Sequence, residues 1–168
     1  MGWIYLVGFM GVGKTTLGRS LASELDRPFF DLDEAIVADE RRSVATIFEL
    51  DGEAAFRRLE TRALRSVTTG ERDGVVATGG GTYTIEENRR IMSASGVTVW
   101  LDVPFATLER RVDPSLRPLW DDDAASRELA RKRRKYYGLA DLRLELGSDS
   151  VETSTRRLRQ LVASYRNA

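Results

Sequence analysis

A glycine-rich motif near the start of the chain constrains the fold more than any other feature. Residues 8–15, GFMGVGKT, match the phosphate-loop pattern G-x-x-x-x-G-K-[ST] at every fixed position. An apolar run at 3–7, typical of a buried parallel strand, precedes the motif, and residues 15–25, with apolar positions at helical spacing, follow it. A strand, a glycine loop and a helix in this order are the context in which the pattern binds phosphate.

Each part of this loop has a physical role in binding a nucleoside triphosphate. Glycines let backbone amides close around phosphate oxygens, and the N-terminus of the next helix adds partial positive charge. Lys14 is expected to reach the β- and γ-phosphates and the Thr15 hydroxyl to bind Mg²⁺, while Thr16 packs or caps. Lysine occurs only at Lys14, Lys132 and Lys135, so a chance match is rare. GTPases, ATPases and kinases share the loop, which therefore does not choose the reaction.

Composition excludes several classes of chemistry. The 168 residues include neither cysteine nor histidine, which removes disulfides, thiolate nucleophiles, iron–sulfur clusters and imidazole sites. The 26 basic and 26 acidic residues cancel in charge, which argues against attachment to nucleic acid or a membrane by overall charge.

We find neither a secretory signal pattern nor an apolar stretch long enough to span a membrane, so we expect a cytoplasmic protein. Nothing in the sequence demands an oligomer, and a monomer is expected.

The rest of the chain alternates between strand and helix patterns. Further strands are expected at 28–33, 74–78, 96–103 and 142–146. Helices are expected at 44–68 with a break near residues 51–52, at 84–94, from Pro104, at 124–138 and at 151–164. Residues 112–123, with two prolines and an acidic cluster, are expected to form a loop. This alternation predicts one α/β domain over residues 1–168, a three-layer α/β/α arrangement with a mostly parallel sheet and sites at the carboxyl ends of its strands.

Two carboxylates follow the second expected strand. Asp31 and Asp33 are separated by one residue, so strand alternation directs both to the same side. One acid can hold Mg²⁺ through water while the other accepts a hydrogen bond from an attacking hydroxyl. The alternative is a helix cap leading into residues 34–36.

An ion pair and a glycine run are the next candidates. Arg57 and Glu60 are spaced i, i+3 on an expected helix and can pair, which holds a guanidinium ready for a carboxylate or phosphate. A solvated helix face is the alternative. Gly79, Gly80 and Gly81 directly follow a strand, and such a run indicates a close approach to the backbone, expected from substrate or phosphate. A tight turn without function is the alternative.

Arginines gather around the expected loop at 112–123. Arg110, Arg111 and Arg117 lie beside or within it, and a loop that carries arginine can close over phosphates. Residues 131–135, RKRRK, form a basic run on the next helix. A solvated or nucleic-acid-binding face is the alternative for this run, although the acidic residues 121–123 would repel a polyanion.

Taken together, these residues resemble the shikimate kinases, a family of small P-loop enzymes. The likeness extends over nearly the whole chain and rests on GFMGVGKT, FFDLDEAI, SVATIFELDGEAAFRRLE, VVATGGG, LRPLW and YYGLAD, in this order. The resemblance implies a five-stranded parallel sheet with strand order 2-3-1-4-5, a substrate-binding helical region at about 33–62 and a lid at about 112–124. It also implies transfer of the γ-phosphoryl group of MgATP to the 3-hydroxyl of shikimate. A P-loop kinase for gluconate or a nucleotide, and a nucleotide-dependent module that binds nucleic acid through residues 131–135, are the other hypotheses.

The resemblance implies a role for each candidate residue. The residues implied for ATP are Gly11, Val12, Gly13, Lys14, Thr15, Thr16, Arg110, which flanks adenine, and Arg117. Those implied for shikimate are Asp33, Arg57, Glu60, which orients Arg57, Gly79, Gly80, Gly81 and Arg133. Mg²⁺ is expected at Thr15 and, through water, at Asp31, and the catalytic set is Lys14, Asp33 and Arg117. The family run Arg-x-Pro-Leu-Tyr reads RRKYY at 133–137 here, so Arg131, Lys132 and Arg134 are alternatives to Arg133.

Overall fold

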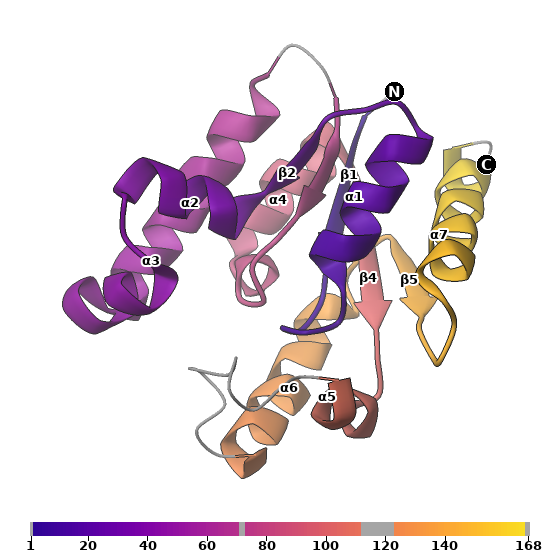
Figure 1. Cartoon of the computed structure of the whole chain (residues 1–168). Coiled ribbons are helices and arrows are strands. Elements are labelled where there is room, and N and C mark those ends of the chain that lie inside the picture. The colour runs from indigo at the N-terminus through magenta and orange to yellow at the C-terminus, as the bar shows by residue number, and fades with distance from the viewer. Residues whose placement is uncertain (1, 71–72, 112–122, 167–168) are drawn as a thin grey trace.

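Five parallel strands form one sheet in the order β2-β3-β1-β4-β5 (Figure 1). The computed structural model describes residues 2–70, 73–111 and 123–166, without the side chains of residues 110, 111, 123 and 166. The strands are β1 (Trp3–Val7), β2 (Phe29–Asp31), β3 (Val75–Ala77), β4 (Gly96–Asp102) and β5 (Leu142–Glu145). The predicted fold class and strand order are confirmed.

Helices connect these strands in the α/β alternation that the sequence predicts. They are α1 (Lys14–Glu24), α2 (Leu32–Glu40), α3 (Val44–Thr68), the short 3-10 helix η1 (Thr82–Thr84), α4 (Glu86–Ser95), α5 (Phe105–Arg111), α6 (Asp123–Tyr137) and α7 (Val151–Arg166). The break expected in the long helix is present, because Gly52 has φ 81° and ψ 168° inside α3. The expected lid at about 112–124 lies almost entirely outside the described residues.

Helix α2 confirms the alternative given for Asp31, a helix cap leading into residues 34–36, and lies in the helical region that the family resemblance implies. It begins directly after Asp31, whose side-chain oxygen Oδ1 accepts hydrogen bonds from the backbone amides of Asp33 at 3.0 Å and Glu34 at 3.3 Å. This carboxylate satisfies amides that have no partner within the helix, so the chain turns from strand to helix there. Asp33 therefore belongs to the first turn of α2, and the expectation that strand alternation orients it is wrong.

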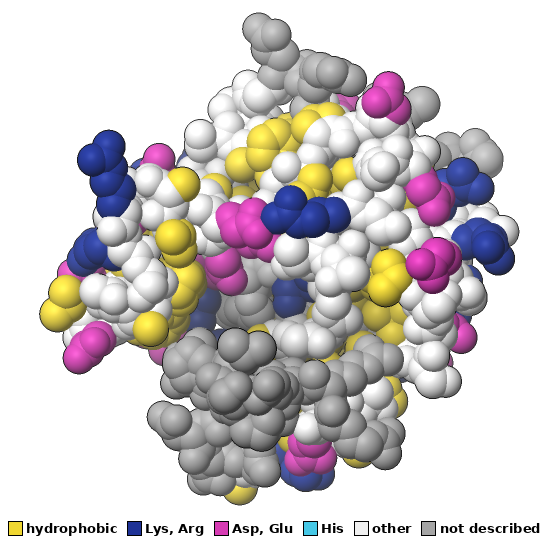
Figure 2. All heavy atoms as spheres, in the orientation of Figure 1, with side chains coloured by type: hydrophobic (Ala, Val, Ile, Leu, Met, Phe, Trp, Pro, Cys, Tyr) yellow, Lys and Arg dark blue, Asp and Glu magenta, His cyan; other side chains and the backbone are white. Residues whose placement is uncertain are grey.

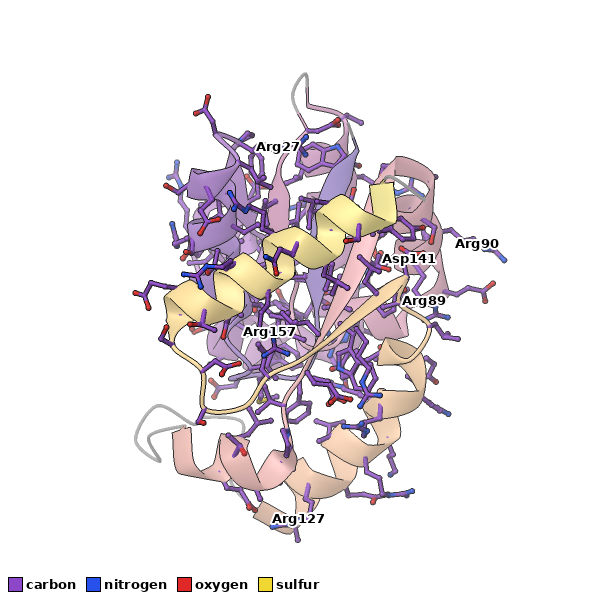
Figure 3. All side chains as sticks on the ribbon, turned by 90° about the vertical axis from the view of Figure 1, so that its right-hand side faces the viewer. Arg27, Arg89, Arg90, Arg127, Asp141 and Arg157 are labelled. Atoms are coloured by element: carbon purple, nitrogen blue, oxygen red, sulfur yellow. The ribbon has the colours of Figure 1, made fainter. Side chains whose placement is uncertain are left out.

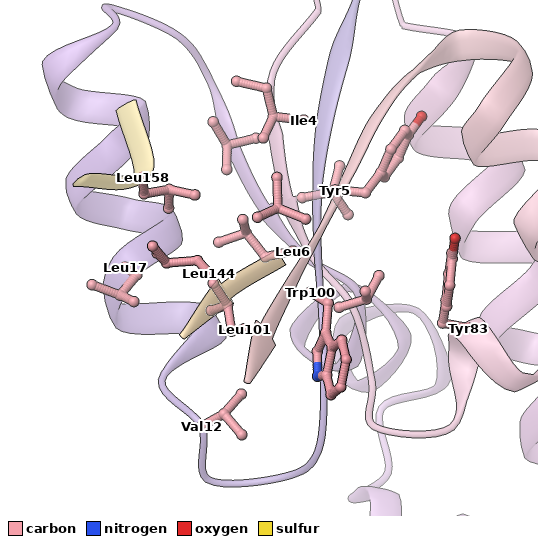
Figure 4. Packing of buried hydrophobic residues seen from close by; sticks show 14 of the residues in the cluster. Ile4, Tyr5, Leu6, Val12, Leu17, Tyr83, Trp100, Leu101, Leu144 and Leu158 are labelled. Carbon is pink, nitrogen blue, oxygen red and sulfur yellow. The ribbon is translucent and has the colours of Figure 1, made fainter. Parts of the chain in front are cut away.

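Helices cover both faces of the sheet and bury its apolar side chains. Alternation along β1 places Ile4 and Leu6 on the side of α1 and α7, and Tyr5 on the other side (Figure 4). The Tyr5 hydroxyl is 2.6 Å from the Ser95 hydroxyl at the end of α4. Because every β1 side chain is buried, the strand is apolar along its whole length.

Helix α2 and the first part of α3 project from this body (Figure 1). They pack on a small hydrophobic cluster of their own, formed by Ile36, Ile47 and Phe56. This projecting part corresponds to the helical region expected at about 33–62. Among the described helices, none is long and apolar enough to cross a lipid bilayer.

Candidate active site

The phosphate loop joins β1 to α1 with an open helix N-terminus. Gly11 and Gly13 have φ values of 78° and 97°, a region that side chains disfavour. Gly8 has φ 145°, and a Cβ there would lie only 2.8 Å from the carbonyl oxygen of Leu101. Gly13 occupies the N-cap position of α1 without a side chain to cap it. The first amides of α1 are therefore available to an anion.

Lys14 lies beneath this loop, with only 8% of its surface exposed. Its ammonium donates to the carbonyl oxygens of Gly8 at 2.9 Å and Phe9 at 2.8 Å. Burial lowers the pKa of Lys14 to about 8, although the charges of Asp33 and Asp31 act in the opposite direction. No carboxylate of the described chain forms an ion pair with Lys14, so the ammonium is available to an anionic ligand.

Thr15 and Asp31 bring side-chain oxygen atoms together beside the loop. The Thr15 hydroxyl donates to Asp31 Oδ2 at 2.6 Å, while Oδ1 of the same carboxylate caps α2. The described residues form no cluster of three or more acidic side chains that could hold a metal ion. Mg²⁺ prefers hard oxygen ligands and is commonly held by one carboxylate together with substrate phosphates and water, so these two residues fit it.

The side chains of Val12 and Thr16 differ in their surroundings. Val12 is buried in the hydrophobic core (Figure 4), so only its backbone can face a phosphate. Thr16 lines both the phosphate-loop cavity and a second cavity between the loop and residues 146–151.

The sequence analysis missed the segment 146–151, which follows β5 and lines this second cavity. Arg157 of α7 holds it by donating to Asp149 Oδ2 at 2.5 Å (Figure 3).

Asp33 lies where two cavities meet. It lines the phosphate-loop cavity and a neighbouring cavity that extends toward α3 and α6. Its buried Oδ1 atom accepts no hydrogen bond within the described structure. Burial raises the pKa of Asp33 to about 6, and the charges of Glu60 and Asp31 add to the rise, while Lys14 and Arg57 oppose it. A carboxylate without a partner between two cavities is suited to receive a proton from a bound hydroxyl.

We call the neighbouring cavity the acceptor pocket. It has a volume of about 260 Å³ and is lined by Met10, Asp33, Val44, Phe48, Glu53, Phe56, Arg57, Glu60, Gly79, Gly80, Gly81, Leu129 and Arg133. Figure 2 shows a hollow beside the projecting part of the molecule with charged side chains inside it. Apolar side chains, among them Phe48, Phe56 and Leu129, line the pocket together with a group of charged residues, as is typical of sites for small polar molecules.

Arg57 has a fixed orientation in the acceptor pocket. Its Nη1 donates to Glu60 Oε2 at 2.5 Å, and its Nη2 donates to Glu53 Oε1 at 2.9 Å. Glu60 is fully buried and also accepts a hydrogen bond from the Thr82 hydroxyl at 2.5 Å. The predicted i, i+3 pair is present, and it is not a solvated helix face.

Arg133 is the member of the basic run 131–135 that enters this pocket. Burial lowers the pKa of Arg133, Tyr137 opposes the shift, and the like charge of Arg57 adds to it. Arg133 is half-buried and has no ion pair with the described residues. Its neighbours are engaged elsewhere, since Arg131 pairs with Glu128 at 2.7 Å and Arg134 with Asp102 at 2.8 Å.

The glycine run at 79–81 is explained by the protein's own charged side chains. None of the three glycines has a positive φ. A Cβ at Gly79 would lie 2.9 Å from Asp33 Oδ1, and one at Gly80 would lie 3.4 Å from a guanidinium nitrogen of Arg133. A Cβ at Gly81 would overlap the guanidinium of Arg57. The close approach predicted from the sequence therefore exists, but site residues make it in the structure and no ligand is needed to explain it.

Arg117 and the side chain of Arg110 lie outside the described residues. Conversely, the structure adds residues that the sequence analysis did not consider as parts of the site, among them Glu53, which binds Arg57, and the hydroxyls of Thr82 and Tyr137. A hydroxyl buried by tertiary contacts leaves no local pattern in the sequence, so no signal was available to find Thr82 and Tyr137.

Comparison with known proteins identifies the family of this chain. Residues 10–163 match the sequence model of the family described as shikimate kinase. The chain belongs to the shikimate kinase family. The shikimate kinase of Parasynechococcus marenigrum is 42% identical over 167 residues, covering 96% of this chain and 86% of that protein. The shikimate kinase of Aquifex aeolicus is 41% identical over 144 residues, covering 84% of this chain and 85% of that protein.

Solved structures agree with this assignment. The shikimate kinase from Acinetobacter baumannii in complex with shikimate superposes with a TM-score of 0.92 at 34% identity, covering 99% of this chain and 95% of that chain. A gluconokinase from Sinorhizobium meliloti has a TM-score of 0.59 at 14% identity, covering 98% of this chain and 93% of that chain, and shares the fold alone. As a member of the shikimate kinase family, the chain is an ATP-dependent kinase.

Proposed function

We propose that this kinase transfers the γ-phosphoryl group of ATP to the 3-hydroxyl of shikimate, giving shikimate 3-phosphate and ADP. The observation that carries the proposal is a pair of arginines, Arg57 and Arg133, in a pocket that shares Asp33 with the phosphate-loop cavity. Shikimate carries a carboxylate on a ring that also bears hydroxyls. Two guanidiniums suit the carboxylate, and Asp33 suits a hydroxyl that faces the nucleotide.

The nucleotide side follows from the loop and its neighbours. The amides of residues 11–15 and the ammonium of Lys14 bind the β- and γ-phosphates, and the nucleoside extends along the cavity between the loop and residues 146–151. Thr15 and Asp31, the latter through water, hold Mg²⁺, which neutralises phosphate charge when bound with ATP. The assignment of Arg110 to the adenine and of Arg117 to the phosphates is implied by the family resemblance.

Asp33 and Lys14 carry the transfer itself. The arginines fix the acceptor so that its hydroxyl oxygen points at the γ-phosphorus, in line with the bond that breaks. The oxygen forms a bond to phosphorus while the bond from phosphorus to the β–γ bridging oxygen breaks, and the hydroxyl proton passes to Asp33. Lys14 stabilises negative charge on the transferring group, and ADP leaves.

An ADP-release assay with product mass tests this function. Purified protein receives MgATP and, separately, shikimate, quinate, gluconate or a nucleoside monophosphate. We expect phosphorylation of shikimate above the others and no turnover when Mg²⁺ is chelated. If another acceptor reacts while shikimate stays inert, the arginine pair has been assigned to the wrong substrate. If none reacts, the kinase proposal is wrong. Size-exclusion chromatography of the 18.9 kDa chain tests the expected monomer.

A further inference from the structure

A chain of buried hydrogen bonds runs behind Arg57. The fully buried Thr82 donates its hydroxyl to Glu60 Oε1 at 2.5 Å, while Glu60 Oε2 accepts from Arg57 at the same distance. The carbonyl oxygen of Thr82 in turn accepts a hydrogen bond from the buried Asn88 amide at 3.0 Å. Both oxygens of Glu60 are therefore engaged, and Thr82 restrains the carboxylate that orients Arg57 together with Glu53.

A second hydrogen bond reaches the same segment from α6. The Tyr137 hydroxyl donates to the carbonyl oxygen of Gly80 at 2.5 Å, and only 2% of the Tyr137 surface is exposed. Burial raises the pKa of Tyr137 to about 12, against the opposing charge of Arg133, so the hydroxyl keeps its proton. Tyr137 lies one helical turn after Arg133, whose guanidinium lies over Gly80. The hydrogen bond therefore holds the part of α6 from which Arg133 enters the pocket.

These contacts converge on residues 80–82. We propose that this segment is a common anchor for both arginines of the acceptor pocket, with Thr82 holding Arg57 through Glu60 and Tyr137 holding the Arg133 segment of α6 through Gly80. In this proposal, which rests on the proposed function of the pocket, Thr82 and Tyr137 are positioning residues. Like charges in an empty pocket repel, so the two guanidiniums stay in place only if neighbouring groups hold them. Their fixed separation then selects the acceptor and lowers the entropy lost on binding.

Thr82→Val and Tyr137→Phe remove the two hydroxyls with little change in shape. Each variant is expected to raise the KM for shikimate about tenfold, the effect of losing one strong buried hydrogen bond, while the KM for ATP and kcat stay within about twofold. Thr82→Ser keeps the hydroxyl and is expected to restore the KM. Thr155→Val and Tyr5→Phe remove buried hydroxyls that lie outside the acceptor pocket. They serve as matched controls and are expected to keep the wild-type KM for shikimate.

A second measurement needs no substrate. Hydrogen exchange at the arginine Nη–H groups of the unliganded protein, which include the Arg57 Nη1–H that donates to Glu60, can be followed by ¹⁵N NMR, with Arg57 and Arg133 assigned by substitution. Thr82→Val is expected to accelerate exchange at Arg57 about tenfold and to leave Arg133 unchanged, while Tyr137→Phe does the reverse. If shikimate is not a substrate, the proposed function fails, and these exchange rates still test the anchor.

Two results would overturn the anchor. In the first, Thr82→Val and Tyr137→Phe keep wild-type exchange at both arginines and a wild-type KM. In the second, each variant loses thermal stability but its folded fraction binds shikimate normally. That second pattern would make both hydroxyls structural only.

Discussion

Replacing Gly81 by alanine should displace Arg57 from the acceptor pocket. A Cβ at this position would overlap the guanidinium carbon and both terminal nitrogens of Arg57. Gly81 has φ −99° and ψ −16°, which alanine adopts without strain. The added methyl group, and not a change in the backbone, is therefore the perturbation.

The cost follows from the contacts that Arg57 must give up. Moving the guanidinium breaks its 2.5 Å hydrogen bond to Glu60 and leaves this fully buried carboxylate with the Thr82 hydroxyl as its remaining partner. A hydrogen bond to a charged group contributes about 1.5–3 kcal/mol. We expect the KM for shikimate to rise by about 10- to 100-fold. The melting temperature should fall by several degrees, because the buried charge of Glu60 loses its compensation.

Steady-state kinetics and thermal melts on four proteins test this reasoning. They are the wild type, Gly81→Ala, Arg57→Ala and the double variant. Since the overlap requires the Arg57 side chain, Gly81→Ala should add little to the loss already caused by Arg57→Ala. Gly80→Ala is the matched control for melting temperature, since its methyl group would contact Arg133 at 3.4 Å without overlap. Wild-type KM and melting temperature in Gly81→Ala, or an equal further loss in the Arg57→Ala background, would refute the argument.

Three further outcomes are expected. Asp33→Asn should lower kcat by orders of magnitude with ATP affinity kept, as rapid-mix kinetics and nucleotide titration would show; near-normal turnover would remove Asp33 from the chemistry. Asp33 must be deprotonated to accept a proton, and its pKa is raised to about 6. We therefore expect kcat/KM to fall as the pH drops through about 6, and the residual activity of Asp33→Asn should not show this fall. Arg133→Ala should raise the KM for shikimate about tenfold or more, whereas Arg131→Ala, which removes an exposed residue paired with Glu128, should not; equal effects would contradict the placement of Arg133.

The raised pKa of Asp33 also predicts a stability effect with a definite sign. The folded protein binds the Asp33 proton more tightly than the unfolded chain, so this group's contribution to stability falls as the pH rises from about 4 to about 6. At neutral pH the ionised carboxylate of Asp33 therefore lowers the free energy of unfolding. Asp33→Asn should therefore melt at the same or a higher temperature than the wild type at pH 7.5, as differential scanning calorimetry would show. A marked loss of stability would mean that Asp33 has a stabilising partner.

Local sequence patterns were sufficient to predict the main elements of the fold. The apolar run at 3–7, the spacing of GKT after Gly8 and the alternation of strand and helix patterns predicted the loop, the parallel sheet and the break at Gly52. These features depend on residues adjacent along the chain, through burial periodicity and glycine conformations. The residue pattern gave helix α2 only as an alternative, because its start depends on one side chain, Asp31, that fits a strand end and a helix cap equally well.

The composition of the acceptor pocket required the tertiary structure. The sequence presents four basic candidates at 131–134, and only folding of α6 against β4 and the glycine segment shows that Arg133 enters the pocket while Arg134 turns to Asp102. It likewise presents three glycines without the charged groups that approach them. The sequence by itself determined which chemical groups are available and where the phosphate loop lies, because these depend on local order. The tertiary structure decided which charged groups face one another, because helices distant in sequence meet only through packing.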